Sequence, residues 1–289
     1  MNRFVDLIFG KARRAAPAQP VGLTPEELAR WQAEGFLILR GCISPEEIQR
    51  VRQAVDEEWS GTGSSDHQVD VLSGPDSGRT FTLAQAPAQS RGEVYKLNNL
   101  FARRPDIRKV ALSPRLRAAC AQLLEGEPLI CNSLNFERGS QQPFHIDTWY
   151  MPPPVDGRLV AASIAVDDVG PDNGPIAYYP GSHLIPPYRF SDGRLNEKRE
   201  EMPRCLAYLQ SEIAARGLKE VELRAQSGDV FIWHAQLLHG GRPIRDMRQT
   251  RSSLVVHYWR AGDLPPGLVR VDPAAGSYLG HTLRGEIEF

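Results

Sequence analysis

The pattern of apolar and polar positions changes character near the middle of the chain. In the first part, the TPEE stretch from Thr24 and the SPEE stretch from Ser44 each combine a capping hydroxyl, a proline and a glutamate, which is how helices begin. Residues 36–39 (FLIL) lie between them after Gly35 and are typical of a short strand. The order predicted for this region is helix, strand, helix.

A third helix is predicted from Ser113, where a serine-proline pair precedes apolar residues that recur at helical spacing. Residues 60–90 are rich in glycine, serine, aspartate and proline. We expect them to form a long mobile loop, and loops of that length are more often functional than not.

From residue 129 onward, short apolar runs alternate with turn sequences such as GPDNGP, PGSH, QSGD and HGGRP. The runs are residues 129–136, 159–166, 176–179, 221–223, 230–233 and 253–259. Such spacing predicts an antiparallel sandwich or barrel. Residues 192–217 interrupt the pattern, and within them 197–216 are expected to be helical or loop-like.

These patterns predict one large domain. We expect an N-terminal arm over residues 1–20 and a single domain over 21–289, with a helical framework at about 21–128 and a β core at about 129–262. The arm is apolar and then basic, and its apolar part is too short and interrupted for a signal sequence.

Composition narrows the possible partners. The formal net charge is −1, so the chain is not expected to bind nucleic acid. No apolar run approaches the roughly 20 residues of a membrane span. The four cysteines show no CxxC spacing and do not suggest a disulfide framework, which favours a reducing compartment and predicts a cytoplasmic protein. Oligomeric state is left open.

The stretch QQPFHIDTWY contains a candidate metal-binding pair, His145 and Asp147. On a strand, residues two apart point to the same face, so both side chains can converge on one ion. Two imidazoles and one carboxylate form a facial triad for Fe(II), with three coordination positions left open. Taken alone, the pair is also compatible with an ordinary hydrogen-bonded couple.

The candidate third ligand is His239, in WHAQLLHGG, where we expect a strand to end at a glycine turn. His234 in the same stretch competes with it. Twelve residues later, Arg251 opens the apolar run RSSLVVHYW. An arginine at the start of such a strand needs a partner, and its planar fork suits a carboxylate.

The chain resembles the phytanoyl-CoA dioxygenase family of Fe(II)- and 2-oxoglutarate-dependent oxygenases. The resemblance begins at LTPEELARWQAEGFLILRGCISPEEI and continues through YKLNNLF, HIDTWYM, DNGPIAYYPGSH, GDVFIWHAQLLHGG and RSSLVVHYW. Each piece is weak, but their order and spacing together are specific. The resemblance implies a mainly β (α+β) fold with a double-stranded β-helix core, also called a cupin-like jelly roll, and an N-terminal helical framework.

The resemblance also implies roles for individual residues. Fe(II) would be bound by His145, Asp147 and His239, and the distal carboxylate of 2-oxoglutarate by Arg251. Lys96 in YKLNNLF and Ser163 match positions that contact the cosubstrate in some relatives, although position 163 is tryptophan in others. Gly241 stands where several relatives carry a serine that can contact the cosubstrate.

The activity implied by the resemblance is a dioxygenase that uses O₂ to hydroxylate an unactivated C–H bond of a small molecule, with succinate and CO₂ as co-products. Relatives that halogenate replace the metal carboxylate with glycine or alanine, so Asp147 favours hydroxylation. The alternatives are a catalytically silent metal- or ligand-binding jelly roll and, with less support, a zinc hydrolase.

Substrate contacts are sought around the metal pair. Trp149 and Tyr150 follow it and either pack the sandwich or line the pocket, and Gln142 precedes it. Asn132 and Asn135 are expected to share one face of their strand and to contact ligand if that face borders the cavity. His257 is expected to be a core or cavity-wall histidine.

Overall fold

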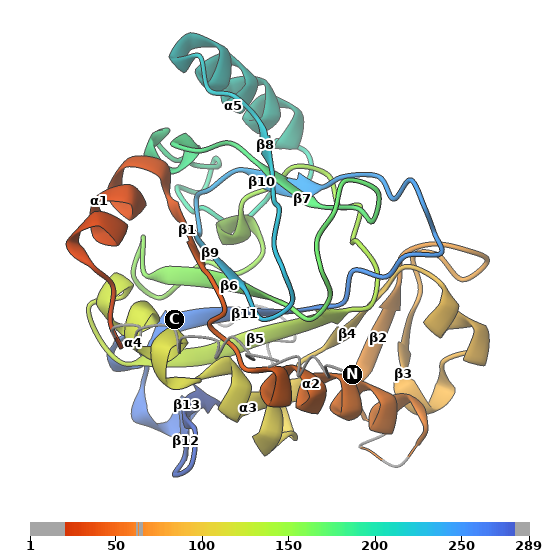
Figure 1. Ribbon diagram of the computed structural model, residues 1–289. Coiled ribbons are helices and arrows are strands. Elements are labelled where there is room, and N and C mark those ends of the chain that lie inside the picture. The colour runs from red at the N-terminus through yellow and green to blue at the C-terminus, as the bar shows by residue number, and fades with distance from the viewer. Residues whose placement is uncertain (1–20, 62, 64–65, 281–289) are drawn as a thin grey trace, which may run out of the picture.

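Two sheets, antiparallel in all but one strand pair, and a helical layer make up the fold, as seen in a computed structural model that describes residues 21–61, 63 and 66–280 (Figure 1). The predicted N-terminal arm, residues 1–20, lies outside the described residues. The helices are α1 (Pro25–Glu34), α2 (Pro45–Trp59), α3 (Pro105–Ala111), α4 (Pro114–Leu123) and α5 (Met202–Arg216). No helix of the described chain is both long enough and apolar enough to cross a bilayer.

The strands form a large and a small sheet. They are β1 (Phe36–Leu39), β2 (Gln68–Val71), β3 (Thr80–Thr82), β4 (Tyr95–Asn98), β5 (Pro128–Phe136), β6 (Leu159–Ala165), β7 (Ile176–Tyr178), β8 (Val221–Glu222), β9 (Val230–His234), β10 (His239–Gly241), β11 (Ser253–Arg260), β12 (Val269–Asp272) and β13 (Gly276–Leu279). The large sheet has the order β1-β9-β6-β11-β5-β4-β2-β3, with β13 added alongside β5 and β12 alongside β13; the small sheet has the order β10-β7-β8. This architecture confirms the predicted jelly roll.

The two faces of the large sheet are buried in different ways. Because side chains alternate along a strand, Leu254 and Val256 of β11 face the layer formed by α2, α3 and α4, which lies below the sheet in Figure 1. Val255 faces the other way and packs in a second cluster with Tyr178 of the small sheet and Trp233 of β9. The helices therefore close one face, and the space between the sheets remains for a site.

The predicted helix starts are confirmed. The Thr24 hydroxyl accepts a hydrogen bond from the amide of Glu27, and the Glu27 carboxylate accepts one from the amide of Thr24. The same reciprocal capping box joins Ser44 and Glu47 at the start of α2. The third helix, α4, begins at Pro114 as expected.

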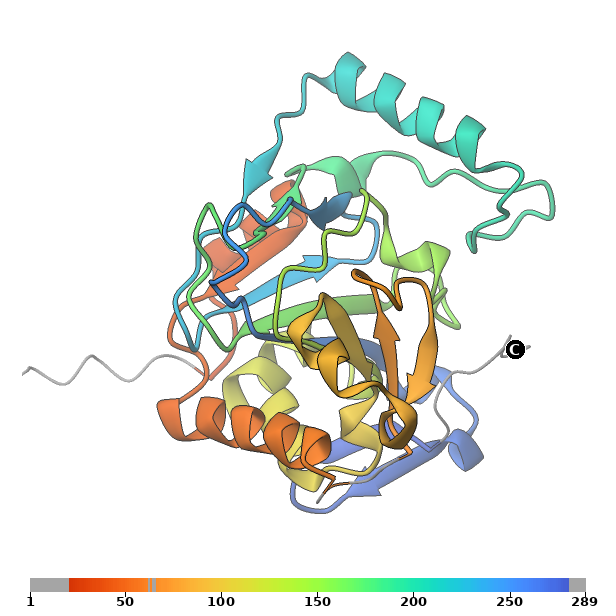
Figure 2. The same ribbon diagram turned by 90° about the vertical axis from the view of Figure 1, so that its right-hand side faces the viewer.

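One expectation about the organisation was wrong. Residues 60–90 do not form one long loop, because β2 and β3 pair within them and extend the large sheet through β4. The strand predicted at residues 36–39 is confirmed as β1, which pairs with β9 and so belongs to the large sheet. The interruption at 192–217 contains α5, which lies outside both sheets (Figure 2).

Candidate metal centre

Three side chains converge between the sheets. The ligand atoms of His145, Asp147 and His239 all lie within 4.8 Å of one another, and all three residues are buried. Within the described chain this is the one cluster of three or more such groups able to hold a metal ion. Two imidazoles and a carboxylate form the donor set of the facial triad that suits Fe(II).

Backbone pairing brings the two histidines together. The amide of His145 donates to the carbonyl of His239 at 2.8 Å, and the reverse bond measures 3.0 Å. Their ring centroids are 4.3 Å apart. The sequence had predicted that a strand ends at His239. In the structure His239 is instead the first residue of β10. This isolated bridge fixes both rings at the edge of the small sheet.

Asp147 reaches the cluster by a route that differs from the predicted one. His145 and Asp147 do not share a regular strand, because Asp147 opens a short 3₁₀ turn, Asp147–Trp149. The amide of Asp147 donates to the carbonyl of Ala235 at 3.0 Å, which ties the turn to the end of β9. The convergence was predicted, but the turn and not strand alternation produces it.

Hydrogen bonds leave both imidazoles ready to bind a metal. The Nδ1 of His145 donates to the carbonyl of Pro143 at 2.8 Å, and the Nδ1 of His239 donates to the carbonyl of Leu237 at 2.9 Å. With the proton held on Nδ1, each ring directs an unprotonated Nε2 into the cluster. Burial, with His239 next to it, lowers the pKa of His145 to about 4, so this ring is neutral at pH 7.

The Asp147 carboxylate is held in a defined orientation. The indole Nε1 of Trp233 donates to Oδ2 at 2.8 Å. The other oxygen, Oδ1, lies 3.9 Å from Nε2 of His145 and 3.6 Å from Nε2 of His239. Burial alone would raise the pKa of Asp147, but the surrounding imidazoles, His239 first, lower it instead. One ionised oxygen is thus free to bind a cation beside the two rings.

Arg251 lies in the same cavity as the triad and is only 2% exposed. Its Nε is buried without a hydrogen-bond partner, and no ion pair joins its guanidinium to a carboxylate of the described residues. Burial lowers the pKa of Arg251 to about 10, so the group still carries its charge at pH 7. A buried cation without a partner is costly, and a ligand carboxylate would satisfy it.

The cavity that contains the triad and Arg251 has mainly apolar walls. Its apolar lining comes from Leu134, Phe136, Ile176, Trp233 and Val255, and its remaining polar lining from Ser140, Gln142 and His257. Sites that bind small molecules combine such apolar walls with a few placed polar groups. The arrangement therefore fits a small ligand bound between a metal ion and an arginine.

Ser140 is a cavity residue that the sequence did not reveal, and it explains the glycine at position 241. A Cβ on Gly241 would lie 2.6 Å from the backbone nitrogen of Gln141 and 2.8 Å from the hydroxyl oxygen of Ser140. Serine therefore does not fit at position 241 unless the neighbouring chain moves. The Ser140 hydroxyl occupies the adjacent space instead.

The two further cosubstrate contacts remain predictions. The Lys96 ammonium lies 3.2 Å from the Asp70 carboxylate, and the two residues are paired across β4 and β2. Ser163 is buried on β6 between Val255 and Phe231 of the neighbouring strands, so it faces the space between the sheets.

The predicted substrate residues lie in different surroundings. Gln142 lines the cavity. Tyr150 is 53% exposed, and its ring centroid is 5.6 Å from that of His145. Trp149 is instead buried in an apolar cluster with Leu209 of α5, and its Nε1 has no hydrogen-bond partner among the described residues. Gln142 and Tyr150 are thus placed to meet a substrate, and the role of all three stays a prediction.

The expectation for the two asparagines of β5 was wrong. Asn132 and Asn135 are three residues apart, so alternation places them on opposite faces. Asn135 lines a separate small cavity with Val51 and Val55 of α2, on the helical side of the sheet. Asn132 is paired with His257 of β11 and shares its face.

The remaining histidines divide clearly. His257 is buried and lines the cavity, as expected, and its Nε2 lies 3.7 Å from Oδ1 of Asp147. His234, the competing third ligand, lies elsewhere, with its ring 5.4 Å from that of His183. Its Nδ1 accepts a hydrogen bond from the amide of Gln236, and burial lowers its pKa to about 4.

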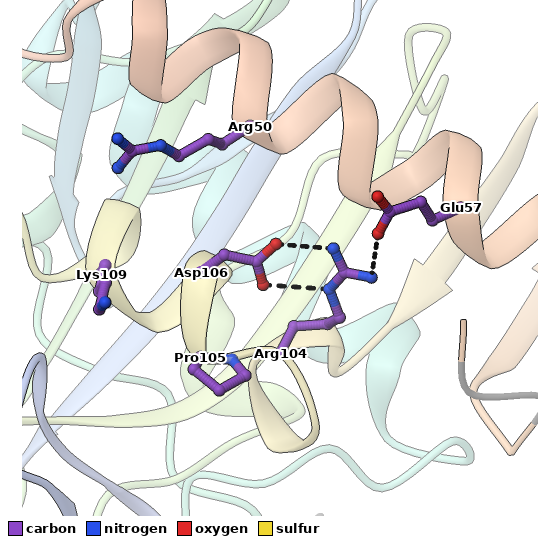
Figure 3. A pocket seen from close by; sticks show the side chains of 6 residues that line it. All are labelled: Arg50, Glu57, Arg104, Pro105, Asp106 and Lys109. Carbon is purple, nitrogen blue, oxygen red and sulfur yellow. Dashed lines mark hydrogen bonds and ion pairs between the residues drawn. The ribbon is translucent and has the colours of Figure 1, made fainter. Parts of the chain in front are cut away.

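A groove lies on the surface of the helical layer, between α2 and α3 (Figure 3). Arg104 lies across it and is held by both oxygens of Asp106, at 2.6 and 3.0 Å, and by Glu57 at 2.8 Å. These hydrogen bonds, that to Asp106 first, raise the pKa of Arg104. Its charge is already balanced by the protein.

Comparisons with known proteins agree with this geometry. The model of the family described as phytanoyl-CoA dioxygenase matches residues 31–251. Phytanoyl-CoA dioxygenase domain-containing protein 1 of Danio rerio is 24% identical over 195 residues, which span 56% of this chain and 66% of that protein, just under two thirds.

Two solved structures share the fold. The non-heme alpha-ketoglutarate-dependent carbocyclase SnoK from nogalamycin biosynthesis superposes with a TM-score of 0.66 at 18% identity, covering 94% of this chain and 98% of its own. EctD from S. alaskensis, solved with 2-oxoglutarate and 5-hydroxyectoine, gives a TM-score of 0.58 at 19% identity, covering 83% and 77%. With its family model matched over most of its length, the chain belongs to the phytanoyl-CoA dioxygenase family.

Proposed function

We propose that this protein is an Fe(II)- and 2-oxoglutarate-dependent dioxygenase that hydroxylates an unactivated C–H bond of a small molecule and releases succinate and CO₂. The observation that carries the proposal is the pairing, in one cavity, of a histidine–aspartate–histidine triad with a buried arginine that has no protein carboxylate as partner. A metal-binding cluster explains the first feature, and an anionic ligand would explain the second, because Asp167 attracts the Arg251 guanidinium without forming an ion pair with it.

Each residue has a separate task in this proposal. His145, His239 and Oδ1 of Asp147 hold the metal, and the Trp233 indole keeps Oδ2 turned away from it. Arg251 binds the distal carboxylate of the cosubstrate through its planar fork and sets the direction in which that molecule lies. The bound iron and 2-oxoglutarate supply the oxidising chemistry, while the apolar walls exclude water from it.

The proposal of hydroxylation depends on two points beyond the fold. EctD was solved with 2-oxoglutarate and the hydroxylated compound 5-hydroxyectoine, whereas SnoK is described as a carbocyclase, so the fold alone does not determine the reaction. Asp147 is present where halogenating relatives have glycine or alanine. The carboxylate occupies the place where a halide would bind, which supports hydroxylation for this chain.

Binding and turnover can be tested separately. Anaerobic addition of Fe(II) and 2-oxoglutarate is expected to give a weak visible charge-transfer band, and no band would favour a protein that does not bind the pair. A screen of metabolite extracts is then expected to reveal substrate-stimulated formation of succinate. Activity with Zn(II) in place of Fe(II) would indicate a hydrolase instead.

Two substitutions connect the screen to the site. Replacing His145 with alanine removes a metal ligand. Substituting a residue that only hydrogen-bonds to a metal ligand lowers metal affinity by up to roughly 100-fold, so a larger loss is expected here. Arg251→Ala is expected to keep the metal and to lose 2-oxoglutarate. Unchanged turnover in both variants would contradict the assignment of this site.

A further inference from the structure

Asp147 is surrounded by three imidazoles and not two. The third is His257 of β11, which is 3% exposed and whose Nε2 lies 3.7 Å from Oδ1 of Asp147. The corresponding distances from the two ligand histidines are 3.6 and 3.9 Å. His257 is nevertheless not a member of the converging cluster, so it approaches the carboxylate from outside the triad.

The hydrogen bonds of the three rings differ. His145 and His239 each donate from Nδ1 to a backbone carbonyl, which leaves Nε2 without a proton. The Nδ1 of His257 is buried and has no hydrogen-bond partner in the described chain. No acceptor holds a proton on that atom, whereas a carboxylate oxygen faces Nε2. The favourable neutral form of His257 therefore carries its proton on Nε2.

We propose that His257 is a positioning residue that donates a hydrogen bond from Nε2 to Oδ1 of Asp147 and so holds the metal-binding oxygen in place. The inference rests on the metal centre of the proposed function. With Trp233 donating to Oδ2 at 2.8 Å, each oxygen of the buried carboxylate then has its own donor. Such partners orient metal ligands and are part of the site.

A ring protonated on Nε2 has no lone pair there to bind the metal. His257 is thus a donor to the ligand and not a fourth ligand. This distinction matters for the proposed reaction, because a fourth protein ligand would leave two open positions, and the cosubstrate alone requires two. The assignment keeps a third position open.

The test is titration of the metal-free protein with Co(II), followed by the visible absorption of the bound ion, without any turnover. In His257→Gln the side-chain amide places an N–H near the position of imidazole Nε2. In His257→Asn the amide lies near the position of Nδ1, too short to reach Asp147, and His257→Leu has no donor. His234→Asn is the matched control, a half-buried histidine outside the cavity.

Cobalt affinity is expected to fall roughly 10- to 100-fold in His257→Asn and His257→Leu and to stay within about threefold of wild type in His257→Gln and His234→Asn. The band intensity, which reports coordination number, is expected to be unchanged. Thermal unfolding of the metal-free variants shows whether each is folded. If His257→Leu does not fold, the comparison of His257→Gln with His257→Asn still tests the inference.

Wild-type affinity in His257→Asn and His257→Leu would overturn the inference, and so would an equal loss in His257→Gln, which would indicate packing. A change in coordination number would also overturn it, because His257 would then be a ligand. In each of these cases the wild type still binds cobalt, and the proposed function stands. A wild-type protein that binds no cobalt would overturn the proposed function as well.

Discussion

Two arginines of this chain differ in whether protein carboxylates bind their guanidinium groups. Arg104, in the groove between α2 and α3, is held by Asp106 and Glu57, and these hydrogen bonds raise its pKa (Figure 3). Arg251, between the sheets, is more deeply buried, has no protein carboxylate bound to it, and its pKa is lowered to about 10. The first arginine stabilises the fold, and the second is attracted by Asp167 without contacting it and is left free to bind an anionic ligand.

The substitution expected to change the stability of the protein most is Arg104→Met. In Arg104→Met, the carboxylates that now share this cation lose it, and one of them, on Glu58, is on a fully buried side chain 3.5 Å away. Breaking a partly buried network of this kind is expected to lower the free energy of unfolding by about 3 kcal/mol. Chemical denaturation of the metal-free protein measures this. A variant as stable as wild type would show that the network contributes nothing.

A histidine outside the cavity gives the next effect. The pKa of His234 is lowered by burial to about 4 from its ordinary value of about 6.5, so between these values the unfolded chain binds a proton that the folded chain does not. Stability is therefore expected to be constant above pH 6.5 and to fall as the pH is lowered toward 4. This one group contributes about 3 kcal/mol of that loss at pH 4.

The variant that isolates this contribution is His234→Asn, whose side-chain oxygen can still accept the hydrogen bond from Gln236. The difference between unfolding free energies at pH 7 and pH 4 is expected to shrink in this variant, measured without metal. An unchanged difference would mean that His234 titrates alike in the folded and unfolded chains.

Arg251→Met is expected to stabilise the ligand-free protein, whereas Arg104→Met is expected to destabilise it. Replacing a buried, unpartnered cation with an apolar side chain of similar length is expected to raise the stability of the ligand-free protein by about 1–2 kcal/mol. The midpoint of thermal unfolding without metal or 2-oxoglutarate measures it. A clear destabilisation would show that the protein already satisfies this guanidinium.

The smallest effect is expected for Asn135→Ala. Asn135 faces the helical side of β5, away from the cavity that contains Arg251. Its replacement is therefore expected to leave the affinities for metal and 2-oxoglutarate within about twofold of wild type. Binding titrations measure both affinities. A large loss would place Asn135 in the site after all.

The sequence predicted much of this because local signals were strong. The TPEE and SPEE stretches contain complete capping boxes, and short apolar runs marked the strands of the two sheets. The triad and Arg251 were predicted from the order of motifs, and the structure brings all four into one cavity. The features predicted correctly are therefore those that short stretches of sequence specify.

Features that depend on distant contacts were missed. The strands of the β2–β3 hairpin are short and lie in a stretch rich in glycine, serine and aspartate, so only the pairing of β2 with β4 identifies the hairpin as part of the sheet. His257 resembles a core histidine in sequence, and only the turn that carries Asp147 brings the two together. The placement of Asn135 was the exception, since strand alternation alone indicated the opposite face.

The central claim is that Arg251 binds the distal carboxylate of 2-oxoglutarate beside the triad. The most direct measurement is anaerobic calorimetric titration of the Fe(II)-loaded protein with 2-oxoglutarate and with pyruvate, a 2-oxo acid that lacks the distal carboxylate. Arg251→Met is expected to lose about 3 kcal/mol of binding free energy, roughly 100-fold in affinity, for 2-oxoglutarate and none for pyruvate. Arg104→Met is expected to bind both as wild type does. If Arg251→Met bound 2-oxoglutarate with wild-type affinity, Arg251 would not be the partner of the distal carboxylate.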